Sequence, residues 1–98
     1  MPIVGNARPV VGGVDTHLDT HVAAVVDALG GVLGVESFPV NRAGYEALVL
    51  WMSGFGPIDR VGVEGTGAYG AGLARHLARE QIAAVSYTHL TLPTSDLV

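Results

Sequence analysis

Two carboxylates, Asp15 and Glu64, are the residues whose type and position could best support chemistry. Each comes at the end of an apolar run that predicts a strand, Pro9–Val14 before Asp15 and Arg60–Glu64 for the second. Open α/β sheets bind their ligands outside the carboxyl ends of the strands. If the two strands are neighbours, the sheet therefore brings both carboxylates to one edge.

The chemistry that such a pair implies is metal binding. Two carboxylates at close range repel each other unless a proton or a cation lies between them, and a hard divalent cation such as Mg²⁺ suits oxygen ligands. Two ions about 4 Å apart would serve in-line phosphoryl transfer, one activating the attacking water or hydroxyl and the other stabilising the leaving oxygen. Asp15 would then be the bridging ligand. Spacing alone favours a plainer interpretation, in which Asp15 caps a turn and Glu64 ends a solvated strand.

Four histidines raise the question of a different metal. His17, Asp19 and His21 alternate, so on one extended strand they would point to the same face and superficially resemble a transition-metal site. We prefer the alternative that they line the exposed face of a hairpin strand. His76 lies in the apolar stripe of a predicted helix, where a packed histidine is more common than a ligand.

Two glycine-rich segments suggest nucleotide binding. Residues 65–70, Gly-Thr-Gly-Ala-Tyr-Gly, match the G-x-G-x-x-G pattern of dinucleotide-binding proteins. Against this, Glu64 would place a negative charge beside the pyrophosphate, and no acidic residue ends a strand about 20 positions later to bind a ribose. These glycines equally suit a sharp turn beside a metal-binding carboxylate.

Residues 12–16, Gly-Gly-Val-Asp-Thr, resemble the phosphate-binding turn of actin-like and sugar-kinase-type ATPases. A nucleotide-binding module of that class is our alternative function. In that fold glycine and threonine or serine usually follow the aspartate closely, whereas His17, Leu18 and Asp19 bring bulk and charge. We therefore rank this interpretation second.

The elements that must position these residues follow from hydrophobic periodicity. Gly30 and Gly31 predict a tight hairpin turn, Asn41 is placed to cap a helix, and a second helix should follow residues 65–67. The order of strand, strand, strand, helix, strand, helix, strand predicts a mixed α/β sheet of the ribonuclease H-like type. The expected strands are Pro9–Val14, His21–Ala28, Val32–Phe38, Arg60–Glu64 and Ile82–Val85. The first helix is expected to have an apolar stripe of Tyr45, Leu48, Val49 and Met52. The second is expected to have one face made of Tyr69, Leu73, His76 and Leu77.

Composition limits the classes of protein that remain. The chain has 98 residues, 49% hydrophobic and 14% charged, which fits at most one domain with a buried core. It has no cysteine, and no apolar run approaches the length of a membrane span, so we expect a cytoplasmic protein. The net charge is -4 and the basic residues include no lysine, so the chain offers little electrostatic attraction for nucleic acid.

Several motifs together resemble the amino-terminal DEDD domain of insertion sequence 110 transposases, over about Val10 to Val85. Both acidic strands occur in order with the hairpin and helix between them. The matching segments are Gly13-Val14-Asp15-Thr16-His17, residues 19–27, Phe38-Pro39, Gly44-Tyr45 and residues 61–67.

The resemblance implies a ribonuclease H-like domain that is related to the Holliday-junction resolvase. The domain of this family would use four metal-binding acids and two Mg²⁺ ions for DNA transposition. Asp15 matches the first acid and Glu64 the second. The other two aspartates would lie on a later helix, and Asp96 should not be given that role. The family also carries a carboxyl-terminal domain with a nucleophilic serine and is associated with a structured guide RNA. Leu18 stands where lysine is common in this family.

We therefore expect a truncated DEDD domain over residues 1–85, followed by a divergent tail, residues 86–98, that resembles sequencing-adapter read-through. Such a fragment would neither cleave nor join DNA alone. Because truncation should leave apolar edges exposed, we also expect a homo-oligomer.

Overall fold

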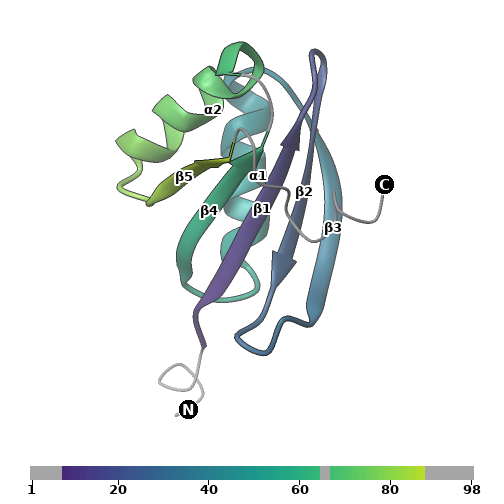
Figure 1. Cartoon of the computed structure of the whole chain (residues 1–98), viewed down its shortest axis with the longest axis vertical. Coiled ribbons are helices and arrows are strands. Elements are labelled where there is room, and N and C mark those ends of the chain that lie inside the picture. Colours follow the sequence, from purple (N-terminus) through teal and green to yellow (C-terminus); the bar gives the residue numbers. More distant parts are fainter. Residues whose placement is uncertain (1–7, 65–66, 88–98) are drawn as a thin grey trace.

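The described part of the chain forms one sheet with two helices (Figure 1). The computed structural model describes residues 8–64 and 67–87. The elements in chain order are β1 (Val10–Thr16), β2 (Thr20–Val26), β3 (Val32–Pro39), α1 (Arg42–Ser53), β4 (Ile58–Glu64), α2 (Gly67–Arg79) and β5 (Ala84–Tyr87).

The sheet is mixed, with strand order β3-β2-β1-β4-β5. β1 pairs antiparallel with β2, which pairs antiparallel with β3. On its other side β1 pairs parallel with β4, and β4 pairs parallel with β5. Parallel neighbours need a crossover connection, and α1 and α2 provide the two crossovers. The predicted fold class, an α/β mixed sheet with the ribonuclease H-like strand order, is confirmed.

Local interactions explain where the hairpin and the first helix begin. The Asp27 carboxylate accepts hydrogen bonds from the backbone N–H groups of Leu29 and Gly31, at 2.9 and 2.8 Å, and closes the turn between β2 and β3. β2 therefore ends at Val26, two residues before the predicted end. The Asn41 side chain accepts a hydrogen bond from the Gly44 N–H at 2.7 Å, so the predicted helix cap is confirmed.

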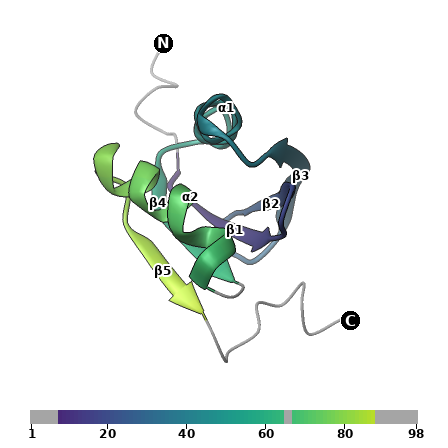
Figure 2. The same ribbon diagram turned by 90° about the horizontal axis from the view of Figure 1, so that it is seen from above.

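The core lies between one face of the sheet and the two helices. Burial alternates along β1, with Val10, Gly12, Val14 and Thr16 inward. Met52 of α1 packs so close to Gly12 that a side chain there would overlap its sulfur atom. Figure 2 shows the two helices beside each other, seen from above. The buried apolar residues are Val10, Val14, Ala23, Val25, Phe38, Leu48, Met52, Val61, Val63, Leu73 and Leu77.

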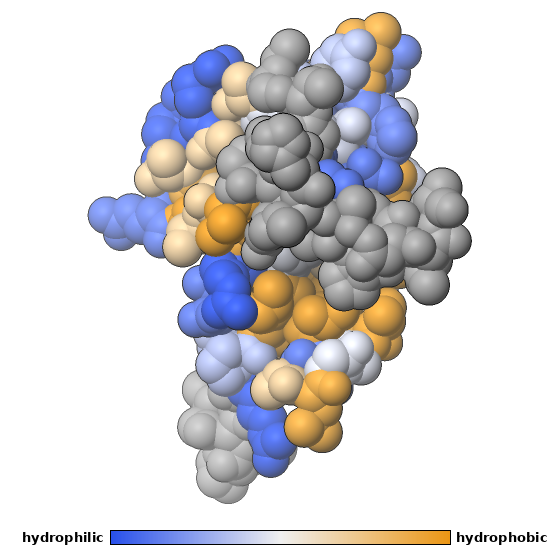
Figure 3. All heavy atoms as spheres, in the orientation of Figure 1, coloured by the Kyte–Doolittle hydropathy of each residue, from blue (hydrophilic) through white to orange (hydrophobic). Residues whose placement is uncertain are grey.

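The opposite face of the sheet is apolar and is covered by neither described helix. Val32 and Val35 of β3 are 59% and 57% exposed, and cross-strand pairing places Val26 and Ala24 beside them. In Figure 3, where α1 lies behind the sheet, apolar side chains gather over β1, β2 and β3. A solvated face of an antiparallel sheet is normally polar, so this face has the composition of one that is covered.

Two expectations about individual elements need correction. Tyr69, expected on the buried stripe of α2, is 43% exposed, while Leu73, His76 and Leu77 are buried. The last strand was expected over Ile82–Val85 but runs over Ala84–Tyr87, because Gly62 pairs with Val85 and the parallel ladder continues for two more residues. The expected division between residues 85 and 86 falls inside β5, and it stays a prediction, because residues 88–98 of the expected tail 86–98 lie outside the described residues. Neither described helix is long and apolar enough to cross a membrane.

Candidate metal centre at the carboxyl ends of β1 and β4

Asp15 and Glu64 are direct partners in the parallel pairing of β1 and β4. Val14 and Val63, one position earlier, are also partners, and both are buried against the helices. Because side chains alternate along a strand, Asp15 and Glu64 lie on the opposite, open face. The Asp15 side chain is 48% exposed and Glu64 is partly buried. The expected juxtaposition of the two strand ends is thus present, and the role of the two residues as metal ligands stays a prediction.

The two strands are also joined through a side chain that the sequence did not single out. The Thr16 hydroxyl donates a hydrogen bond of 2.8 Å to the backbone carbonyl of Glu64. Thr16 is only 5% exposed, and a buried hydroxyl requires an acceptor. The alternating pattern of β1 was the available signal, because it places Thr16 on the buried face next to Asp15.

The imidazole of His17 lies beside the Asp15 carboxylate. Its Nε2 lies 3.3 Å from Oδ2 of Asp15, and the two side chains are 58% and 48% exposed. An exposed pair of this kind contributes little to stability, at most about 1 kcal/mol. It does keep an imidazole beside the carboxylate that faces solvent.

The structure separates the three residues that resembled a transition-metal site. His17 and Asp19 are exposed in the turn between β1 and β2, whereas His21 is partnered with Thr16 and is 0% exposed. Among residues 8–64 and 67–87, no group of three or more His, Cys, Asp or Glu side chains could hold a metal ion. The transition-metal interpretation is wrong, and so is the expectation that His21 lies on an exposed face.

His21 is instead part of the core. Its ring stacks on Tyr45, with centroids 6.0 Å apart and an interplanar angle of 14°. Neither ring nitrogen has a hydrogen-bond partner. Burial lowers the pKa of His21 from its ordinary value of 6.5, the Thr20 backbone partly opposes this, and the charge of His17 lowers the pKa further.

The glycines serve packing in this part of the chain. Residues 12–16, which resemble the phosphate-binding turn of the alternative function, all lie in β1, and the turn that follows is formed by residues 17–19. A Cβ on Gly70 of α2 would lie 3.0 Å from Val63 and 3.5 Å from the Thr16 methyl group, so α2 approaches both strands closely. Residues 65–66 of the G-x-G-x-x-G segment lie outside the described residues.

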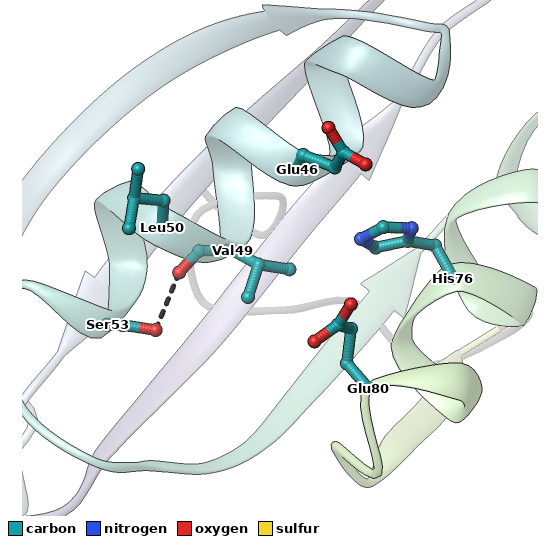
Figure 4. A pocket seen from close by; sticks show the side chains of 6 residues that line it. All are labelled: Glu46, Val49, Leu50, Ser53, His76 and Glu80. Atoms are coloured by element: carbon teal, nitrogen blue, oxygen red, sulfur yellow. Dashed lines mark hydrogen bonds between the residues drawn. The ribbon is translucent and has the colours of Figure 1, made fainter.

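A pocket of about 300 Å³ lies on the helical side of the molecule, away from this edge. Glu46 of α1 and Glu80, just after α2, lie on either side of the His76 ring (Figure 4). His76 is 5% exposed and its ring packs against Tyr45, with centroids 5.8 Å apart. The expectation that His76 is a packed residue is confirmed.

The donor set at the ends of β1 and β4 suits a hard divalent cation. Asp15 and Glu64 supply carboxylate oxygens from paired positions, and the exposure of Asp15 leaves room for water. Mg²⁺ is typically bound through one or two carboxylates and keeps several waters or substrate oxygens. The described residues thus fit Mg²⁺ as a pair of ligands, with the other positions supplied from outside the pair.

The fold and this edge define a class, an α/β domain with ribonuclease H-like strand order and paired acidic strand ends. A family model described as "Transposase", for DEDD transposases of the insertion sequence 110 type, matches residues 12–94. The chain belongs to this transposase family. Among the curated proteins, none matches it.

Two solved structures match this chain. Archaeoglobus fulgidus Pelota is 14% identical with a TM-score of 0.62, and the match covers 97% of this chain and 31% of that one. Ribonuclease H1 of the halophilic archaeon Halobacterium salinarum is 19% identical with a TM-score of 0.46, covering 90% of this chain and 89% of that one. The chain thus spans about a third of the length of Pelota, and at this level of identity the likeness concerns the fold alone.

Proposed function

We propose that this chain is the amino-terminal part of the catalytic domain of a DNA transposase that cleaves and joins phosphodiester bonds. The observation that carries the proposal is the pairing of Asp15 with Glu64 at the carboxyl ends of β1 and β4. Membership of the transposase family makes DNA the expected substrate. Two partners are further parts of the proposal: a structured guide RNA, taken from the family resemblance, and a second copy of this chain, expected from its exposed apolar edges.

Asp15 and Glu64 would hold Mg²⁺, with two ions in the complete site. Bound there, the ions would activate a nucleophile and stabilise a leaving oxygen. The chain itself contributes the two carboxylates, a rigid sheet edge that fixes their spacing, and His17 next to Asp15. Its net charge of -4 gives it little attraction for DNA, so cations at this edge would also reduce the repulsion of phosphates.

The family resemblance implies four acids, of which Asp15 and Glu64 match two. An ion held by half of its ligands exchanges freely and cannot be placed accurately against a scissile bond. We therefore propose that this chain, by itself, does not catalyse cleavage or strand transfer.

Mn²⁺ tests the site directly, because this paramagnetic substitute for Mg²⁺ broadens the NMR signals of nearby amides. We expect selective broadening at residues 14–17 and 62–64 in the wild-type chain, and its loss in Asp15→Asn and in Glu64→Gln. Asp19→Asn removes the same charge from the exposed turn nearby and should leave the broadening in place. Broadening that persists in both site variants would contradict the proposal.

A further inference from the structure

Glu64 is the last residue of β4, and it is paired with Asp15 of β1 on one side and with Tyr87 of β5 on the other. Because it ends its strand, no later residue of β4 helps to hold it in the sheet. The direction of the Glu64 side chain depends on the restraints that keep this end of β4 in register with β1.

Thr16 provides such a restraint from the neighbouring strand. Its hydroxyl donates to the Glu64 carbonyl at 2.8 Å, across 48 positions of sequence. Thr16 directly follows Asp15, and its side chain points to the opposite face of β1. Thr16 thus links the ends of the two strands that carry Asp15 and Glu64, from the buried face of the sheet.

The Thr16 side chain is itself held in one orientation. A β-branched side chain has few accessible χ1 rotamers. The methyl group of Thr16 faces α2 at Gly70, where a Cβ would lie 3.5 Å away. With the methyl group against α2 and 5% of the residue exposed, the hydroxyl is directed at β4.

We infer that Thr16 is a positioning residue for the metal centre: its hydroxyl fixes the end of β4 so that Glu64 is aligned with Asp15. This inference rests on the proposed function, since it assigns a task to Thr16 only if Asp15 and Glu64 hold a cation together. Thr16 does not contact the cation in this account. It acts through the Glu64 backbone.

The test compares Mn²⁺ affinity in Thr16→Val and Thr16→Ser, by amide broadening in the 98-residue chain. Valine keeps the branched shape and the contact with α2 but removes the donor, whereas serine keeps the donor and loses the methyl group. Removing an outer partner of a metal ligand typically weakens metal affinity by about 10- to 100-fold, and we expect roughly the lower value for valine. Serine should stay within about twofold of wild type, since it keeps the outer partner.

A control separates positioning from general stability. Val25→Ala makes a cavity in β2, on the buried face and away from the carboxylate edge, and should lower the unfolding temperature without changing Mn²⁺ affinity. All affinities are measured at a temperature where each variant is folded. If Thr16→Val does not fold, Thr16→Ala replaces it: lower Mn²⁺ affinity in the alanine than in the serine variant supports the hydroxyl, and equal affinities in the two variants overturn its role.

The outcomes distinguish this inference from the proposed function. Binding in the wild type that Asp15→Asn abolishes but Thr16→Val leaves unchanged would overturn the role of Thr16 and keep the metal site. Absence of localised broadening in the wild type would remove the site, and with it any positioning role. Weakening by valine, and not by serine or Val25→Ala, supports the inference.

Discussion

At the scale of single residues, His21 is the least ordinary feature of the core. It is fully buried between the sheet and α1, with both ring nitrogens unpartnered. A buried polar atom without a partner costs about 1–3 kcal/mol. Its stacking on Tyr45 offsets a part of this cost. A charged imidazolium at this position would lose its hydration, and no hydrogen-bond partner of either ring nitrogen would replace it.

The lowered pKa of His21 makes folding depend on pH. Because the pKa is lower in the folded state than its ordinary value of 6.5, the unfolded chain binds more protons as pH falls below that value. The stability contribution is therefore complete above the unfolded pKa and is lost in acid, with a slope that approaches at most about 1.4 kcal/mol per pH unit.

Urea unfolding at pH 7.5 and pH 5 measures this slope. His21→Phe keeps a ring against Tyr45 and should flatten the dependence on pH, whereas His17→Asn, which removes an exposed histidine, should keep most of it. An identical pH dependence in wild type and His21→Phe would show that another group is responsible.

At the scale of elements, hydrophobic period and turn residues predicted all seven elements in the correct order. The apolar runs before Asp15 and Glu64 also predicted that these residues lie at the carboxyl ends of two strands. The structure pairs the two strands, with Asp15 one residue before the end of β1 and Glu64 at the end of β4. The burial of His21 and the hydrogen bond from Thr16 were not predicted. Both depend on which residues of two strands lie opposite each other, and a single sequence does not show this. His21 is placed by its pairing with Thr16 across a turn, and the Thr16 hydrogen bond joins strands that are far apart in the sequence.

Gly44 shows how the elements constrain one another. It lies in the first turn of α1 and is buried, and a Cβ there would overlap the backbone carbonyl of Pro39 at the end of β3. Alanine is favoured over glycine in a helix by about 1 kcal/mol, so propensity alone predicts that Gly44→Ala stabilises the chain. The Pro39 carbonyl belongs to the backbone and cannot rotate away as a flexible side chain can. We therefore expect α1 to shift away from β3 in this variant.

We expect Gly44→Ala to lower the free energy of unfolding by about 1–3 kcal/mol, the usual range for overpacking. Thermal or urea unfolding measures this effect. Ala47→Gly, at an exposed position of the same helix, provides the comparison and should cost about 1 kcal/mol through propensity alone. A Gly44→Ala variant as stable as wild type would mean that α1 is not held close to β3.

At the scale of the whole molecule, neither the charge of the chain nor the composition of its surface is suited to binding DNA. The chain carries a net charge of -4 and no lysine, so it offers little to hold a phosphate backbone. The open face of the sheet is apolar at Val32 and Val35, on the side where Asp15 and Glu64 end their strands. On our proposal, the edge at Asp15 and Glu64 needs additional ligands and a nucleic-acid surface before it can act on DNA.

We therefore expect the chain with Mg²⁺ or Mn²⁺ to leave supercoiled and branched DNA uncut, even at a large excess of protein. The Asp15→Ala, Glu64→Ala double variant is the matched control, because it retains the fold and lacks the carboxylates. Cleavage by the wild-type chain and not by the control would show that two acids are sufficient, and our proposal of an inactive chain would be wrong while the metal site stood. Equal cleavage by both would place the activity elsewhere, because no route through Asp15 and Glu64 survives their removal.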